Sequence, residues 1–288
     1  NLPLDTGMGG LEAAMQGQSQ PFYIYEQLRL DFATQFLEQD FDRVPKDVDV
    51  LLIVHPKPLN QRTLYAIDQF VMRGGRVFAM LDPLSELSQV RGPNGQPLAG
   101  STLSSAESLG KVLESWGVAV EPKFVIGDQA LAQRVQTGSG DGMADYVLWL
   151  SFPAANLDPK DRITANMQAL NLGTVGEINK LEKATTTVTP LIRTSPVTME
   201  IPVEKAENNP DPDELTRTFL SSNERFDVGV RVSGPIKSAF PDGPPKESLE
   251  QKPVAEGAPK PEPLPAHLKE TKTANIILLA DSDVFNDN

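Results

Sequence analysis

Two short apolar runs with one helical pattern between them constrain the fold of this chain more than any other feature. The runs are residues 48–54 and 77–81, and both are nearly continuous series of apolar side chains, as in strands buried on both faces. Parallel neighbouring strands need a crossover of a dozen or more residues, which a helix usually supplies. The segment therefore predicts a βαβ unit and an α/β fold.

The helix between the two runs carries its own start and stop signals. Leu64, Ile67 and Val71 fall on one helical face, which is the face expected to pack on the sheet. Asn60 can cap the first turn with its side-chain oxygen, and Gly74 can end the helix because glycine adopts positive φ without strain.

Further elements follow from shorter patterns. Alternating or β-branched apolar residues indicate strands, and capping residues before an apolar periodicity indicate helices. Strands are predicted at 31–37, 118–120, 123–126, 146–152, 185–192, 227–232 and 274–280, and helices at 22–30, 104–116 and 158–170.

The stretch at 235–272 differs in composition from the rest of the chain. Nine prolines stand there among Lys, Glu and Gly, with hardly any large apolar side chain, so it cannot bury enough surface to order itself. We predict one α/β domain over residues 1–234, with residues 273–288 returning to the same sheet and residues 235–272 forming a flexible insertion.

Composition excludes several classes of function. The chain has no cysteine, which removes thiol catalysis, thiolate zinc sites and iron-sulfur clusters. Its net charge of −13 repels nucleic acid and anionic lipid on average. The chain begins without methionine and contains no long apolar run, so we expect that any targeting or membrane-anchoring segments lie outside it.

Two polar residues are expected at the carboxyl edge of the predicted sheet, where open α/β folds bind ligands. His55 follows the first apolar run and Asp82 follows the second, so the pair is a candidate binding edge. In the alternative interpretation each residue starts a turn with the proline that follows it. That interpretation is favoured, because His55 has no acidic or histidine partner at turn or helical spacing.

The other candidate groups fit binding patterns poorly. His267 lies in the proline-rich stretch and is expected to be solvated, and two histidines alone disfavour a histidine metal site. Asp281, Asp283 and Asp287 lack the spacing of a calcium loop, so helix capping by one of them is the better interpretation. We predict no catalytic residue, no cofactor and no metal site.

Segments spread over nearly the whole chain resemble the auxiliary component of an uncharacterised ABC-type transport system, a family associated in some bacteria with gliding motility. The most specific are Ile67-Asp68-Gln69-Phe70 and the pair Gly74-Gly75. The segments are, in order, 48–57, 64–75, 81–83, 113–117, 125–128, 146–150, 189–195, 232–240 and 279–283.

The resemblance implies an extracytoplasmic domain at the periplasmic face of the inner membrane, anchored by segments outside this chain and working beside ATPase and permease subunits. It also implies a Rossmann-like layered sheet similar to the class I glutamine-amidotransferase-like fold. It brings no catalytic residues, so a non-catalytic accessory domain is expected. The alternative is a small-molecule or glycan-binding domain, possibly a hydrolase, that uses the edge near His55 and Asp82.

Overall fold

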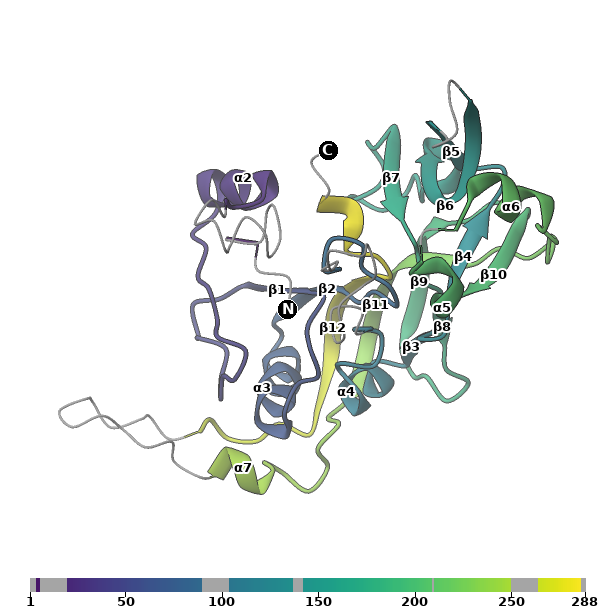
Figure 1. Cartoon of the computed structure of the whole chain (residues 1–288). Helices are drawn as coiled ribbons and strands as arrows, with labels where there is room; N and C mark the ends of the chain where they lie inside the picture. Colours follow the sequence, from purple (N-terminus) through teal and green to yellow (C-terminus); the bar gives the residue numbers. More distant parts are fainter. Residues whose placement is uncertain are drawn as a thin grey trace.

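A five-stranded sheet forms the centre of the molecule (Figure 1). The computed structural model describes residues 4–5, 20–89, 104–136, 142–208, 210–249 and 264–285. The strand order is β1-β2-β12-β11-β9. Their bounds are β1 Val50–Val54, β2 Arg76–Met80, β9 Thr187–Arg193, β11 Asp227–Lys237 and β12 Glu270–Leu279.

The sheet is mixed. β1 and β12 both pair with β2 in parallel, whereas β11 runs antiparallel to β12 and β9 runs antiparallel to β11. The α/β class is therefore confirmed, together with the βαβ unit that β1 and β2 form around helix α3 (Gln61–Met72). The finer likeness to the class I glutamine-amidotransferase-like fold stays a prediction.

Helix α3 begins and ends as its sequence predicts. The side chain of Asn60 accepts a hydrogen bond from the backbone N–H of Thr63 at 2.9 Å. At the other end, Gly74 has φ +92°, its N–H bonds the carbonyl of Val71, and the Gly75 N–H bonds the carbonyl of Phe70. These paired bonds satisfy carbonyls that the end of a helix leaves without partners.

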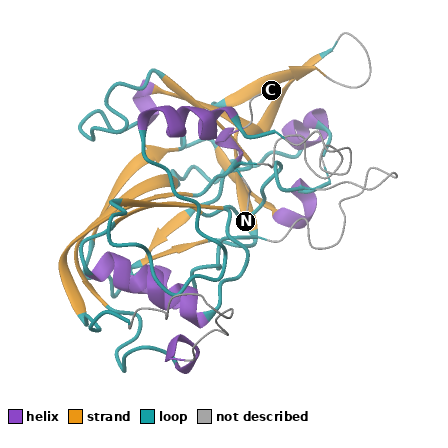
Figure 2. Ribbon diagram, turned by 90° about the vertical axis from the view of Figure 1, so that its left-hand side faces the viewer, coloured by secondary structure: helices purple, strands orange, loops and turns teal. Residues whose placement is uncertain are grey.

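The two faces of the sheet bury different cores. Leu51 and Ile53 of β1 pack on one face with α3 and with α4 (Lys111–Ser115), on the side where these helices lie in Figures 1 and 2. Val54 packs on the opposite face with Ile126 and Leu150. Successive side chains of a strand point to opposite faces, which explains this division.

Smaller antiparallel sheets form the side of the molecule that lies to the right in Figure 1. One sheet joins β4 with β10, another joins β3 with β8, and a third has the order β5-β6-β7. Short helices α5 and α6 pack on this part. The bounds are β3 Val118–Val120, β4 Phe124–Asp128, β5 Ala132–Gln136, β6 Met143–Pro153, β7 Ala169–Gly173, β8 Ile178–Lys180, β10 Thr198–Pro202, α5 Val203–Ala206 and α6 Pro212–Arg217.

The predicted helix at 158–170 is wrong. The carboxylates of Asp158 and Asp161 accept hydrogen bonds from backbone N–H groups two residues on, which forms turns instead of a continuous helix. Leu170 then belongs to β7, where it pairs with Phe152 of β6. Strand pairing with a distant segment outweighed the local helical pattern.

Two other predicted elements also differ from the structure. Residues 32–37 form no strand, because they pair with no described strand and instead follow helix α2 (Tyr23–Asp31). In the stretch 104–116 only α4 is helical, since Gly110 has φ +46° and interrupts the pattern just before it. The residues before Gly110 form turns.

The proline-rich stretch is only partly described. β11 continues to Lys237 and β12 begins at Glu270, while helix α7 (Lys246–Leu249) lies between them. Residues 250–263 lie outside the described residues, so the division into one domain with a flexible insertion stays a prediction.

The expectation that His267 is solvated is wrong. Its ring is stacked on the ring of Tyr65 with centroids 5.9 Å apart, and its Nδ1 lies 3.2 Å from the Tyr65 hydroxyl. Packing on α3 therefore places this histidine against the folded domain.

Candidate functional site

The carboxyl ends of β1, β2 and β12 meet at one edge of the main sheet, because the three strands are parallel. His55 follows β1, Asp82 follows β2 after Leu81, and Asp281 follows β12 after Ala280. The structure therefore brings both residues of the predicted binding edge together, and it adds the carboxylate of Asp281 from a strand far along in the sequence.

His55 is buried at this edge, with 5% of its surface exposed. Its backbone has φ +39°, a conformation that a turn imposes at a cost for a residue other than glycine. The ring Nδ1 lies 3.0 Å from the Ser105 hydroxyl, and Nε2 lies 3.3 Å from the Ser88 hydroxyl. Both ring nitrogens are thus engaged by serines of the protein.

Asp82 is fully buried, with 0% of its surface exposed. One oxygen accepts from the backbone N–H of Leu84 at 2.9 Å, and the other accepts from both the N–H and the hydroxyl of Ser282. Its own N–H donates to the Ser105 hydroxyl, which also contacts His55. These bonds fit the interpretation in which Asp82 starts a turn and accepts hydrogen bonds from the protein. That His55 and Asp82 form a binding edge stays a prediction.

Asp281 and Asp283 complete the polar network. Asp281 accepts from the N–H of Val284, so it caps the short 3₁₀ helix Asp283–Phe285, and it also accepts from the N–H of Gly173 at the end of β7. The capping role expected for one of these aspartates is confirmed for Asp281. Asp287 lies outside the part of the chain that the structure describes.

Asp283 joins three separate segments. Its two oxygens accept from the N–H groups of Glu86 and Leu87 and from the hydroxyls of Ser85 and Thr174, at 2.9 to 3.2 Å. The network therefore ties the carboxyl edge of the main sheet to β7 and to the loop after β2.

Burial changes the acidity of all three carboxyls. Burial first, and then repulsion from Asp283, raises the pKa of Asp82 and of Asp281 well above its usual range. Burial raises the pKa of Asp283 to about 6, against hydrogen bonds from Leu87 and Glu86 that favour the charged form. Over the described ranges, no three acidic or histidine side chains are placed to hold a metal ion.

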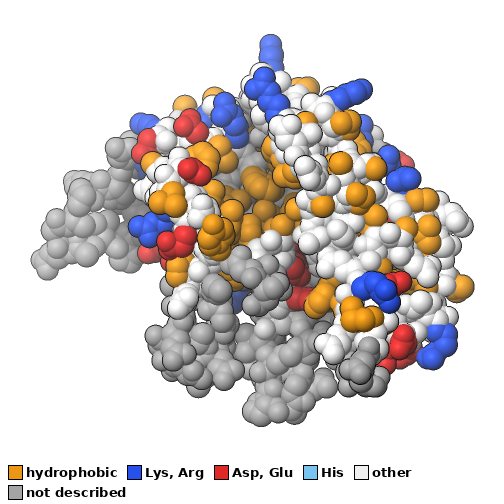
Figure 3. Space-filling view, turned by 90° about the horizontal axis from the view of Figure 1, so that it is seen from above, with side chains coloured by type: hydrophobic (Ala, Val, Ile, Leu, Met, Phe, Trp, Pro, Cys, Tyr) orange, Lys and Arg blue, Asp and Glu red, His pale blue; other side chains and the backbone are white. Residues whose placement is uncertain are grey.

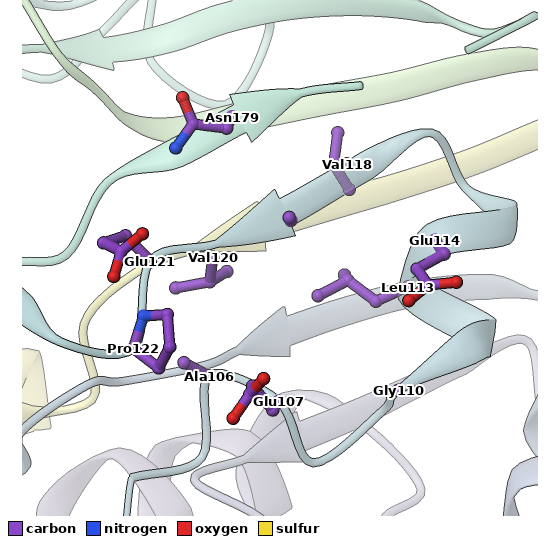
Figure 4. A pocket seen from close by; sticks show the side chains of 11 residues that line it. Ala106, Glu107, Gly110, Leu113, Glu114, Val118, Val120, Glu121, Pro122 and Asn179 are labelled. Atoms are coloured by element: carbon purple, nitrogen blue, oxygen red, sulfur yellow. The ribbon is translucent and has the colours of Figure 1, made fainter. Parts of the chain in front are cut away.

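A separate pocket of about 220 Å³ opens beside β3 (Figure 4). Residues 106–114 line one side, and the other side is formed by β3, the residues that follow it, and Asn179 of β8. Figure 4 shows Leu113 and Val120 facing each other across its middle. The apolar part of the lining consists of Ala106, Leu113, Val118, Ala119, Val120 and Pro122.

The charged part of this lining is entirely acidic. Glu107, Glu114 and Glu121 line the pocket, and none of them forms an ion pair with a lysine or arginine in the described part of the chain. Glu121 accepts one hydrogen bond, from the N–H of Lys123. Glu107 lies in the turn before Gly110 and Glu114 lies in α4, and no local pattern indicated the facing wall.

A fourth acidic residue, the half-buried Glu177, lies next to Glu121, because its backbone carbonyl accepts a hydrogen bond from the N–H of Glu121. Burial raises the pKa of Glu177, and so does repulsion from Glu200, Glu121 and Glu224, while a hydrogen bond from Asn179 opposes the rise. The pocket therefore combines an apolar lining with three carboxylates that form no ion pair among the described residues.

Fold and site together define a mixed α/β domain with a filled polar edge and an open acidic pocket. The chain belongs to the family described as "ABC-type uncharacterized transport system", whose model matches residues 4–288. This confirms the resemblance at the level of an ABC-type transport auxiliary family. No helix among the described residues is both long and apolar enough to cross a membrane.

Comparison with individual proteins gives similarity to solved structures alone. No curated protein matches the chain significantly. Among solved structures, a chain described as "mmIFT52 N-terminal domain" is 10% identical, with a TM-score of 0.42 over 91% of this chain and 79% of that one.

Proposed function

We propose that this chain is a non-catalytic accessory domain of an ABC-type transport system, working on the extracytoplasmic side beside an ATPase and a permease subunit. The observation that carries the proposal is membership of the transport auxiliary family over residues 4–288. In this proposal, anchoring to the inner membrane comes from segments outside the chain, and the link to gliding motility follows the same family resemblance.

The geometry of the sheet edge supports a non-catalytic role. Ligands of open α/β folds usually bind outside the carboxyl ends of the strands. Here His55 and Asp82 are buried and hydrogen-bonded to serines, so their polar atoms already have partners within the protein. An accessory role needs no reacting group at this edge and acts instead through the surface of the domain.

The surface of the domain includes large apolar side chains that are exposed to water. Leu30 of α2 is 78% exposed, and Phe32 and Phe36 after it are 65% and 56% exposed. Figure 3 shows hydrophobic side chains spread over the face seen from above. Exposed apolar patches often mark contacts with partners, so these residues are the first to test.

The test is affinity purification of the tagged full-length protein from its own membranes, with mass spectrometry of the proteins that accompany it. We expect an ATPase and a permease subunit. Recovery of the protein alone would overturn the accessory role.

A surface variant then maps the contact. We expect that replacing Leu30, Phe32 and Phe36 by serine lowers recovery of the partners, while Leu220→Ser does not. Leu220 is a matched control because it is 80% exposed on a different part of the surface. Equal recovery with both variants would place the contact elsewhere.

The absence of cysteine from this chain provides a test of location. In the full-length protein, Leu220→Cys introduces an exposed thiol, which a membrane-impermeant maleimide can reach only from its own side of the membrane. We expect labelling in intact spheroplasts above that of the unsubstituted protein. Labelling that requires lysis of the cells would contradict the extracytoplasmic location.

A further inference from the structure

The acid-rimmed pocket beside β3 has an interior suited to a narrow apolar group. Leu113 and Val120 point into its middle, and Val118 and Pro122 extend the apolar lining (Figure 4). Its volume of about 220 Å³ leaves room for a long side chain. Leu113 and Val120 are only 4% exposed, whereas Ala119 and Pro122 are partly exposed, so the apolar surface removed from water on binding would be mainly that of the occupant. This favours an occupant with a hydrocarbon stem.

The rim selects the charge of that occupant. Glu107 and Glu114 on one wall and Glu121 on the other are without an ion-pair partner among the described residues. Lys111, the lysine of the same wall, is directed elsewhere, since its Nζ lies 3.6 Å from the ring centroid of Phe240. An anionic occupant would be repelled, whereas a cation would be attracted by several carboxylates at once.

We propose that this pocket is a docking site for a basic amphipathic segment of a partner protein, with a lysine or arginine side chain inserted between the walls. The stem of such a side chain can lie along Leu113 and Val120 while its charged end stays at the rim. The carboxylates of Glu107, Glu114 and Glu121 can then accept hydrogen bonds from the ammonium or guanidinium group of that side chain. The inference stands on the pocket and does not rest on the accessory role proposed above.

The overall charge of the chain supports the same partner. A net charge of −13 attracts basic segments at long range and speeds their encounter. The apolar walls distinguish this site from the rest of an acidic surface, because a polar cation without a hydrocarbon stem gains little there.

The experiment measures binding of a fluorescein-labelled peptide of alternating lysine and leucine to the purified chain by fluorescence anisotropy. Three comparison ligands are used: the same peptide with glutamate for lysine, the same peptide with serine for leucine, and free spermidine as a competitor. We expect binding of the lysine-leucine peptide that weakens with salt, and weaker binding of the other three.

Two triple variants separate the pocket from general charge. Glu107, Glu114 and Glu121 are replaced by glutamine in one, and the exposed Glu38, Glu204 and Glu270 in the other. We expect the pocket variant to bind about tenfold more weakly, because each carboxylate contact adds a fraction of a kcal/mol or more. The control variant, with the same change in net charge, should bind within about twofold of the parent, since exposed distant charges are screened.

A third variant tests the walls. Pro122 lines the pocket and is partly exposed, so Pro122→Ser should weaken binding of the peptide while leaving the thermal unfolding midpoint close to that of the parent. Equal losses in both glutamine variants, equal binding of the serine peptide, or full displacement by spermidine would each overturn the proposal. Failure of the lysine-leucine peptide to bind would overturn it as well.

Discussion

Ser282 donates both its backbone N–H and its hydroxyl to one carboxylate oxygen of Asp82, at 2.8 and 2.6 Å, although 200 residues separate the two in the sequence. The pair closes the carboxyl edge between β2 and β12. A carboxylate held in this way is an acceptor for the protein itself, which explains why an aspartate at this position need not be catalytic.

At two other places a serine hydroxyl and a backbone N–H bind the two different oxygens of one aspartate. Asp128 at the end of β4 accepts from the N–H and the hydroxyl of Ser195, at 2.6 and 2.7 Å. Asp68 on α3 accepts from the hydroxyl of Ser238 and from the N–H of Ala239, at 2.7 and 2.8 Å. All three aspartates are fully buried, and each joins segments that are far apart in the sequence.

Replacing Asp128 by alanine should destabilise the fold strongly. It leaves four donors without their acceptor, namely the N–H groups of Ala130, Leu131 and Ser195 and the Ser195 hydroxyl. Because each buried donor left unpaired is costly, we expect a loss of about 3 kcal/mol or more in the free energy of unfolding, measured with urea. The control is Asp145→Ala, which removes an exposed 3.6 Å ion pair and should change stability little.

Alanine substitutions at Asp68 and at its neighbour Gln69 should lower the free energy of unfolding by different amounts. The Gln69 side chain exchanges two hydrogen bonds with the backbone of Leu268, at 2.8 and 3.0 Å, but these bonds are exposed. We therefore expect Gln69→Ala to cost about 1 kcal/mol and Asp68→Ala at least twice as much, because Asp68 is buried. Equal losses in chemical denaturation would show that burial does not set the strength of these contacts.

Stability should fall as the pH rises from about 4 to about 6, because burial raises the pKa of Asp283 to about 6. In this window the unfolded chain has already lost the proton that the folded chain still holds, so ionisation favours unfolding. The raised pKa values of Asp82 and Asp281 act in the same direction. Thermal unfolding midpoints measured across this range should decline, and Asp283→Asn should reduce the slope even though it lowers stability. A parent protein that becomes steadily more stable over the same range would contradict this account.

Two glycines with positive φ should respond differently to alanine. At Gly117, with φ +82°, an added Cβ would lie 2.5 Å from the Ala184 side chain and 2.7 Å from the Thr186 hydroxyl. At Gly74, with φ +92°, nothing lies within 4 Å. We expect Gly74→Ala to cost about 1 kcal/mol of backbone strain and Gly117→Ala to cost more than ~2 kcal/mol, because overlap adds to strain. Similar midpoints for the two variants in urea would exclude overlap as the cause.

The elements that can be predicted from the sequence are those whose signals are local. The helical face of α3, its cap at Asn60 and its end at Gly74 all depend on residues within a few positions of each other. The apolar runs of β1 and β2 are equally local, so the βαβ unit and the α/β class followed from them. The same logic placed His55 and Asp82 at one edge, where the structure links both to Ser105.

Features that depend on residues far apart in the sequence could be seen only in the folded chain. Leu170 lies in a strand because it pairs with β6, although its own segment has a helical pattern. Asp82 has its hydrogen bonds satisfied within the protein because Ser282 lies beside it in the fold. The pocket exists because β3 and residues 106–114 face each other. Segments that come into contact only in the folded chain set the strand pairing, the burial of a carboxylate and the shape of a cavity. Local sequence patterns carry no information about such contacts.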